Sequence, residues 1–288
     1  MLITLKNEYG AFYIGGGNHE TARLIEITGL GLAGKEVTSV VFPSQAGHTV
    51  KKFRDSERTV TMSFDFYGEP HIAERLYKIL YHPLYICINR GDGVRRKIYA
   101  YISEECEIES IIFHKWQKIA LQFICPNPYF NDGTNLTKNI GGHIDRLPNA
   151  YEGSEWKISL PCIATERTTR RIIYNNGDVL VYPVFTIKNH GSNSQSASHT
   201  VTVKNHTTEK SITVTVMISS SDTVIIDVPK RKITKNGAVI TNCLSDTSVL
   251  SEMYLAVGEN DLEILTNDEN DIIGMDIEYT NNYAAVTL

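Results

Sequence analysis

Histidine and cysteine side chains can hold a metal ion when they recur at ligand spacing. The nine histidines form no His-Glu-x-x-His or His-x-His pattern and have no acidic or cysteine companion at that spacing; they stand at positions 19, 48, 71, 82, 114, 143, 190, 199 and 206. The five cysteines, at positions 87, 106, 125, 162 and 243, contain no Cys-x-x-Cys pair. Most of them lie in apolar strand patterns, which is typical of reduced core cysteines. We therefore expect no metal site and no cofactor.

The sequence gives equally little indication of a catalytic nucleophile or of a catalytic pair of carboxylates. The sequence has no Gly-x-Ser-x-Gly and no serine or cysteine in a glycine-rich elbow. A glycosidase needs two carboxylates flanking one bond, and Glu104, Glu105, Glu107 and Glu109 are the nearest approach to such a set. Three of these four would share the wet face of a single strand, so we expect a protein that is not an enzyme.

A glycine-rich stretch, residues 29–36, matches both Gly-x-Gly-x-x-Gly and Gly-x-x-x-x-Gly-Lys. Both phosphate-binding motifs require a helix to open at the glycines, so that its N–H groups face the phosphate. Residues 37–43 are instead β-branched and stop at a proline, and Glu36 occupies the place of the magnesium-binding hydroxyl. The stretch predicts a glycine-rich hairpin or bulge.

Strand and helix patterns alternate in the first half of the chain. Residues 58–67 alternate apolar and polar side chains, which predicts a strand with one wet face. A basic cluster of Lys51, Lys52, Arg54 and Arg58 leads into this strand, and we interpret it as a solvated loop or as a contact with an acidic neighbouring subunit. Pro70 at a first-turn position and an apolar stripe predict a helix over 71–81.

The organising stretch of the chain is Phe123-Ile124-Cys125-Pro126-Asn127-Pro128-Tyr129-Phe130. Two prolines stop the strand that runs into it, because proline lacks the N–H that a ladder needs. Glycine and asparagine then dominate, and from Trp156 onward short strands follow one another with turn residues between them and no helical stripe. This pattern favours an antiparallel sandwich or jelly roll.

Length and composition limit the number of domains and the class of protein. A chain of 288 residues suits two domains, and 42% hydrophobic with 21% charged residues is ordinary for a globular protein. We expect an N-terminal domain over 1–132, a linker over 133–153 and a C-terminal domain over 154–288. The net charge of −5 argues against specific nucleic-acid binding. The sequence shows neither a signal peptide nor an apolar run long enough for membrane insertion.

Three parts of the sequence, in this order, resemble the distal tail protein family of long-tailed bacteriophages. The first is the strand led by Arg58, followed by the helix that ends at Pro83. The second is a Cys-Pro-x-Pro-Tyr-Phe ending, and the third is a Gly-x-Asn turn after a later strand. The family-like residues are Arg58, Pro83, Cys125, Pro126, Pro128, Tyr129, Phe130, Gly258 and Asn260.

The resemblance implies a mainly β protein with one short helix: an N-terminal split-barrel-like β domain and a C-terminal galectin-like β-sandwich of jelly-roll type. It also implies a structural virion protein at the tail tip, assembled in the host cytoplasm. Its partners would be itself, as a hexameric ring, the tail tube protein and the tail-associated hub protein. Receptor-binding proteins or side fibres would be held by the C-terminal domains.

Two further hypotheses come from the residues. Opposite charge suggests a contact between subunits that pairs the basic Lys51, Lys52 and Arg54 with the acidic Glu105 and Glu107. The alternative function is recognition of a host cell-wall glycan by the C-terminal sandwich, which needs an exposed aromatic side chain to stack on a sugar ring. Trp156, Tyr174 and Tyr182 are the available aromatics.

Overall fold

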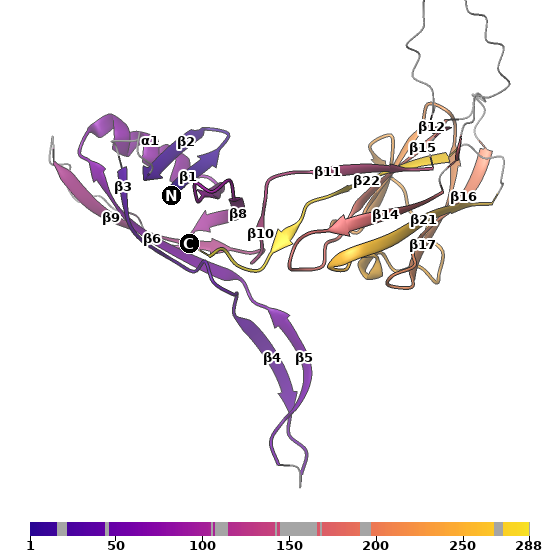
Figure 1. Cartoon of the computed structure of the whole chain (residues 1–288), viewed down its shortest axis with the longest axis horizontal. Coiled ribbons are helices and arrows are strands. Elements are labelled where there is room, and N and C mark those ends of the chain that lie inside the picture. The colour runs from indigo at the N-terminus through magenta and orange to yellow at the C-terminus, as the bar shows by residue number, and fades with distance from the viewer. Residues whose placement is uncertain are drawn as a thin grey trace, which may run out of the picture. The chain divides into compact units, whose positions relative to one another are not determined.

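The computed structural model organises the chain as two compact units (Figure 1). Unit 1 comprises Met1–Gly133 and Asn282–Leu288, and unit 2 comprises Thr134–Asn281. The structure describes residues 1–15, 22–43, 46–104, 106, 115–141, 143–144, 166–167, 169–190, 197–267 and 273–287. Strands dominate both units, and the described part of the chain contains one α-helix. The mainly β fold class is therefore confirmed.

Unit 1 is built on one antiparallel sheet in the order β2-β1-β7-β8-β9-β6-β3. Its strands are β1 Leu2–Asn7, β2 Gly10–Gly15, β3 Ala22–Thr28, β6 Arg58–Tyr67, β7 Leu84–Asn89, β8 Arg95–Ile102 and β9 Trp116–Cys125. The alternation expected in β6 is present, because Val60, Met62, Phe64 and Phe66 are fully buried. Strand β6 pairs with β9 over the whole length of both strands.

The helix α1, Pro70–Leu80, lies where the sequence places it. Pro70 occupies the first turn, where its missing N–H has no helical partner to lose. The side chains of Ile72, Leu76 and Ile79 face the core that the sheet of unit 1 also lines. The helix therefore closes one face of the sheet, and Pro83 follows before β7 begins.

The last described residues belong to unit 1, although the sequence places 154–288 in one C-terminal domain. Strand β23, Asn282–Tyr283, pairs with β10, Phe130–Asn131. The amide of Val286 donates to the carbonyl oxygen of Leu30 over 2.8 Å, and the Val286 side chain is buried in the core of unit 1. The chain thus returns to its first unit after completing the second.

Unit 2 is an antiparallel sandwich whose two sheets share one hydrophobic core. The first sheet contains β11 Leu136–Ile140, β22 Ile273–Tyr279, β15 Val184–Asn189, β18 Thr223–Asp227, β19 Lys232–Lys235 and β20 Ala238–Val239. The second contains β14 Arg170–Asn175, β21 Gly258–Thr266, β16 Ala197–Asn205 and β17 Lys210–Ile218. The minor elements are a pair of two-residue strands, β12 His143–Ile144 and β13 Glu166–Arg167, and a 3-10 turn, Leu250–Glu252.

Strand β11 lies inside the stretch that the sequence assigns to a linker. It pairs with β22 from Leu136↔Tyr279 to Ile140↔Met275 and is an edge strand of its sheet. Its residues Leu-Thr-Lys-Asn-Ile are mostly exposed, so they lack the buried alternation that identifies a strand locally. The strand is specified by its distant partner β22.

We predict that removal of residues 282–288 destabilises unit 1 and leaves unit 2 folded. The deletion removes β23, the buried Val286 side chain and the amide that donates to the carbonyl oxygen of Leu30. Hydrogen exchange followed by mass spectrometry should show lost protection in β9 and β10, while β16 and β21 keep theirs as an internal control. Unchanged exchange throughout unit 1 would contradict this prediction.

Candidate functional site: a projecting arm and its arginine anchor

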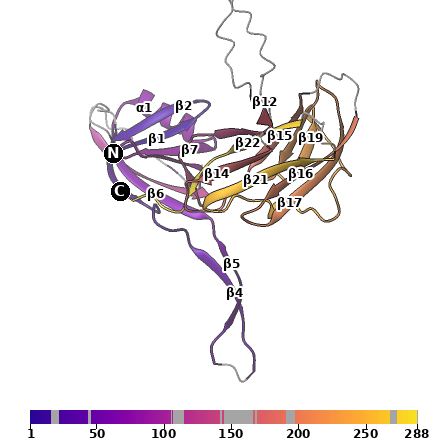
Figure 2. The same ribbon diagram turned by 45° about the vertical axis from the view of Figure 1, so that its right-hand side comes forward.

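Two strands of unit 1 form an arm that stands apart from the main sheet. Strands β4, Lys35–Val40, and β5, Thr49–Asp55, pair only as a two-stranded antiparallel sheet. The arm projects from the rest of unit 1 in both ribbon views (Figures 1 and 2). The glycine-rich stretch itself forms neither a hairpin nor a bulge, because residues 29–34 are irregular and join strands that do not pair with each other. The bulge lies further along the chain, where the register of β4 and β5 shifts between Thr38 and Ser39.

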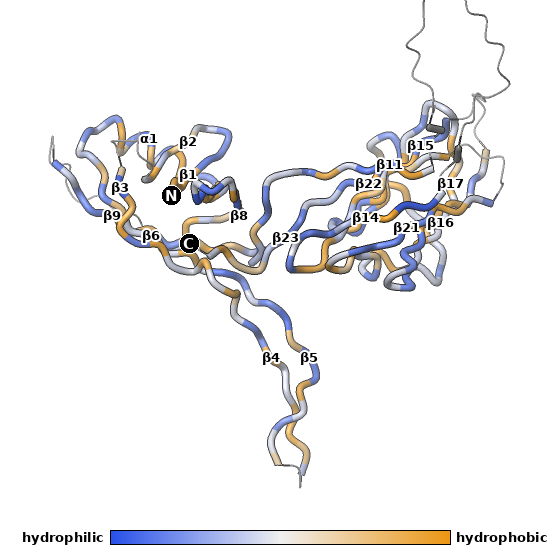
Figure 3. Tube along the Cα trace, in the orientation of Figure 1, coloured by the Kyte–Doolittle hydropathy of each residue, from blue (hydrophilic) through white to orange (hydrophobic). Residues whose placement is uncertain are grey.

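The arm is amphipathic although almost all of its residues are exposed. Val37 pairs with Phe53 and Ser39 with Val50, so that these side chains share one face of the ribbon. The three apolar members, Val37, Val50 and Phe53, are between 54% and 65% exposed. Figure 3 shows hydrophobic stretches toward the tip of the arm. An isolated two-stranded ribbon is only marginally stable in water, so this apolar face calls for a covering partner.

Three of the four residues of the basic cluster form part of this arm, whereas Arg58 is buried at the start of β6, so the interpretation of the cluster as a loop is wrong. Lys51, Lys52 and Arg54 lie in strand β5, and Arg54 contacts Glu36 on the paired strand at 2.6 Å. The sequence does not indicate this strand, because β5 is stabilised by pairing with β4 and not by burial of alternate side chains. The proposed acidic counterparts, Glu105 and Glu107, lie outside the described residues.

The base of the arm is held by a polar cluster around Asp55. The Lys35 ammonium contacts the Asp55 carboxylate at 2.5 Å, and the Tyr129 hydroxyl donates to its other oxygen. These two hydrogen bonds, with the Lys35 bond the stronger influence, lower the pKa of Asp55 below its ordinary value of 3.8. Tyr129 belongs to the stretch that ends β9, so the cluster ties the arm to the main sheet.

Beside this cluster, the Arg58 side chain joins segments that are distant in the sequence. Its Nε donates to the carbonyl oxygen of Pro128 over 2.7 Å, and its Nη2 donates to that of Ala284 over 2.7 Å. Its Nη1 donates to the carbonyl oxygen of Gly29 over 2.7 Å and also to that of Gly31. Arg58 is only 3% exposed, so these carbonyls replace its hydration.

Aromatic and thiol groups complete the surroundings of the guanidinium. It lies over the Phe130 ring, 4.6 Å from the centroid, in a cation–π contact. Burial lowers the pKa of Arg58 below its ordinary value, while the nearby Asp55 charge opposes that change. Burial also raises the pKa of the neighbouring Cys125 to about 11, so this thiol is neutral and unreactive near neutral pH.

Glycine is required where the chain passes Arg58 before entering the arm. Gly29 has φ +82°, and a Cβ built there would lie 2.0 Å from the carbonyl oxygen of Thr59. The close approach leaves the Gly29 carbonyl in reach of the guanidinium. The glycines that resemble a phosphate loop therefore serve a backbone turn beside Arg58.

The family-like residues fall into two separate groups. The structure brings Arg58, Cys125, Pro128, Tyr129 and Phe130 together in unit 1. Pro126 directly follows β9, and Pro83 separates α1 from β7. The sequence gives no sign of Ala284 or Asp55 as partners, because a backbone carbonyl has no side-chain signature and Asp55 sits in an exposed strand.

The Gly-x-Asn turn lies in unit 2 and holds a local network. Asn260 is fully buried, and its Oδ1 accepts from the Ala256 amide at 2.8 Å while its Nδ2 donates to the Ala256 carbonyl at 2.7 Å. The Asn205 side chain also donates to Asn260 Oδ1 over 3.2 Å. Gly258 has φ +90°, a value that favours glycine. The turn is a structural element of the sandwich.

Two of the three aromatics considered for sugar binding are described by the structure, and both belong to unit 2. Tyr174 and Tyr182 are exposed, whereas Trp156 lies outside the described residues. The Tyr174 hydroxyl reaches Glu259 on β21 at 3.3 Å. Two exposed tyrosines are compatible with stacking on a sugar ring but do not by themselves define a sugar site, so the glycan hypothesis stays a prediction.

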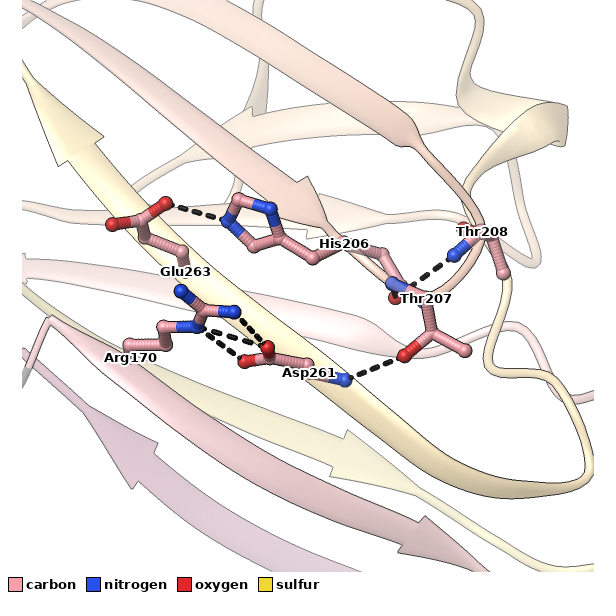
Figure 4. Close-up of polar contacts among 7 residues, drawn as sticks. Arg170, His206, Thr207, Thr208, Asp261 and Glu263 are labelled. Carbon is pink, nitrogen blue, oxygen red and sulfur yellow. Dashed lines mark hydrogen bonds and ion pairs between the residues drawn. The ribbon is translucent and has the colours of Figure 1, made fainter.

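A polar row on β21 is paired within itself (Figure 4). Arg170 Nε donates to Asp261 Oδ1 at 2.7 Å, and His206 Nε2 contacts Glu263 Oε2 at 2.7 Å. The Asp261 amide donates to Thr207 Oγ1 at 3.0 Å. Because these groups satisfy one another, the row offers few free donors to a ligand.

Within the described ranges, no three histidine, cysteine, aspartate or glutamate residues are grouped so that they could hold a metal ion. The described helices include none with the length and apolar character that crossing a membrane requires.

We predict that Arg58→Ala destabilises unit 1 by about 3 kcal/mol or more, because four carbonyl acceptors lose a buried partner. Arg58→Lys should also destabilise, since an ammonium cannot reproduce the planar set of donors. Chemical denaturation gives the free energy of unfolding, and Arg54→Ala on the exposed arm is the matched control, with an expected change below about 1 kcal/mol. Equal effects of Arg58→Ala and Arg54→Ala would refute the anchoring role.

Acid should loosen the base of the arm. The folded-state pKa of Asp55 is depressed, so its contribution to stability is present above pH 3.8 and is lost as the pH falls through the folded-state value. Hydrogen exchange of β4 and β5 between pH 6 and pH 3 should increase relative to unit 2. In Asp55→Asn the arm should already exchange faster at pH 6, with a weaker dependence on pH. An identical pH dependence in Asp55→Asn and the parent protein would disprove this assignment.

Comparison with known proteins places the fold among phage tail proteins. Residues 176–283 match the model of the siphovirus-type tail component, C-terminal domain. No curated protein matches the sequence significantly. The crystal structure of SPP1 Dit, described as a paradigm of the hub adsorption apparatus in phages that infect Gram-positive hosts, shares 13% identity with a TM-score of 0.61. That match covers 91% of this chain and 94% of SPP1 Dit.

Two structures of the phage P2 baseplate in its activated conformation, with Ca and with Sr, also match. Each shares 10% identity and covers 96% of this chain and 97% of the other. Their TM-scores of 0.48 and 0.49 are too low to establish a common fold. The resemblance to the distal tail protein family is nevertheless confirmed, because residues 176–283 match the model of the siphovirus-type tail component and the chain has a fold similar to that of SPP1 Dit.

Proposed function

We propose that this chain is a structural, non-enzymatic adaptor at the tip of a phage tail. Six copies close a ring through unit 1, and the ring joins the tail tube protein to the tail-associated hub protein. Unit 2 anchors receptor-binding proteins or side fibres. The observation that carries the proposal is a siphovirus-type tail domain at residues 176–283 inside a chain with the fold of SPP1 Dit.

The geometry of unit 1 favours a role in the assembly of several subunits over a role in catalysis. The arm exposes an apolar face on a rigidly anchored ribbon, which is a feature of a surface that is covered in an assembly. The guanidinium of Arg58 donates its hydrogen bonds to backbone carbonyl oxygens, and the residue is almost fully buried. It is therefore not accessible to a substrate. A ring of such subunits needs two different complementary patches on each copy, because a heterologous contact repeats around a closed symmetry axis.

The net charge of −5 also suits a protein that surrounds a passage for DNA. Lysine- and arginine-rich walls would bind phosphates strongly, whereas an acidic protein lets nucleic acid pass without holding it. We accordingly propose no specific nucleic-acid binding and no membrane insertion for this chain, and a location in the virion at the tail tip.

The purified chain should form rings of six copies, visible by negative-stain imaging and with the corresponding mass by light scattering. If the ring requires its neighbours, co-expression with the tail tube and hub proteins should produce it. A chain that remained monomeric in both cases would contradict the adaptor function. A monomer that bound a defined cell-wall glycan would favour the alternative of carbohydrate recognition instead.

A further inference from the structure

Unit 1 carries a second exposed apolar surface besides the arm. Tyr85, Tyr99 and Tyr101 lie on the outer side of strands β7 and β8, and we call them the tyrosine face. Tyr85 pairs directly with Tyr99 in the strand register. Their ring centroids are 5.1 Å apart, and those of Tyr99 and Tyr101 are 5.4 Å apart. Each of the three residues is 38% to 43% exposed.

The tyrosine face is the uncovered side of a sheet whose other side is fully packed. The intervening residues Leu84, Ile86, Ile98 and Ala100 are buried in the core that α1 also lines. Tyrosine is enriched at the centres of protein interfaces because its ring is large and its hydroxyl can still form hydrogen bonds. Three neighbouring exposed tyrosines on adjacent strands therefore form a good docking surface for apolar side chains.

Charge restricts what can dock there. Strands β1, β2, β7 and β8 contain no aspartate or glutamate, yet they carry Lys6, Arg95, Arg96 and Lys97. A basic partner surface would be repelled, and a neutral apolar surface would not. Docking of an apolar face also avoids burying an unpaired charge, which is costly.

The arm's apolar face, Val37, Val50 and Phe53, meets this requirement. At its base, Lys35 and Asp55 neutralise each other. Lys52 pairs with Thr38 on the opposite side of the ribbon, so it points away from a surface that covers Phe53. The arm can thus present an apolar side to the tyrosine face while this lysine stays in water.

The described part of unit 1 leaves the apolar face of the arm exposed. All of β4 and β5 is exposed except for the ends next to the bend and the base, and the ribbon leads away from the sheet of its own unit 1 (Figures 1 and 2). A contact between an arm and a different surface on the next copy is heterologous, and such contacts generate rings when the rotation closes.

We propose that the arm's apolar face docks on the tyrosine face of a second copy of this chain. The inference rests on the proposed ring, for which it names the contact between neighbouring copies. It differs from the charge pairing of Lys51 and Lys52 with an acidic neighbour, because the apolar side of the arm provides the binding energy.

Photo-crosslinking tests the geometry in the assembled full-length protein. Phe53→p-benzoylphenylalanine places a reactive group on the apolar face, and Lys52→p-benzoylphenylalanine is the matched control on the other side. In a mixture of isotopically light and heavy chains, mass spectrometry should find links between position 53 of one chain and residues 85–101 of another. Position 52 should give no such links. Links from position 53 only to unit 2, to another arm or within one chain would overturn the proposal, as would their absence from assembled rings.

Affinity provides the second readout. Phe53→Glu and Tyr99→Ser should each weaken self-association about 100-fold, which is the range of central interface residues. Lys52→Glu and the unit 2 variant Tyr174→Ser should change it less than about 3-fold, with circular dichroism confirming that all four variants are folded. Rings that persist in Phe53→Glu would overturn the docking contact while leaving the adaptor function intact. Loss of rings in Lys52→Glu with retention in Phe53→Glu would assign the contact to charge instead.

Discussion

The buried guanidinium of Arg58 is the constraint on which unit 1 depends. A charge that is removed from water must recover its hydrogen bonds inside the protein, or it destabilises the fold by several kcal/mol. Arg58 recovers them from the backbone carbonyls of three separate segments, one of which lies 226 residues away in the sequence. The turn before the arm, the stretch that ends β9 and the returning chain after unit 2 are therefore fixed to one side chain.

This constraint explains how a ribbon without a hydrophobic core can keep a defined direction. Strand β5 ends at Asp55, three residues before Arg58 begins β6, and Asp55 is itself bound to Tyr129 beside the same arginine. The base of the arm is thus ordered by the core of unit 1, while its outer part is exposed. Ordering a binding element before it meets its partner lowers the entropic cost of association. In the assembly that we propose, a rigid base is accordingly as important as the apolar residues further along the arm.

The sequence predicts those elements whose signals are local. Strand β6 is specified by its own alternation, α1 by its apolar stripe between Pro70 and Pro83, and the end of β9 by Pro126. It does not predict that residues 282–287 return to unit 1, because the residues of a strand do not by themselves indicate which distant strand they pair with. The sequence likewise does not predict the arm, because the exposed lysines in β5 are typical of a loop. Among the groups around the buried guanidinium, the resemblance to distal tail proteins identifies Arg58 and Phe130. The carbonyl oxygen of Ala284 can be recognised as a partner of Arg58 only from the structure.

An exposed ribbon is also a hazard, because free strand edges and apolar side chains promote aggregation. The arm limits that hazard in ways that are visible in its residues. Three basic side chains lie in β5, and a bulge between Thr38 and Ser39 interrupts the regular pairing. Charged residues and bulges both discourage the indiscriminate addition of further strands. Because strand pairing at its edges is disfavoured in this way, the arm retains the apolar side chains on its face as its main means of association. That restriction would suit a subunit of the ring that we propose.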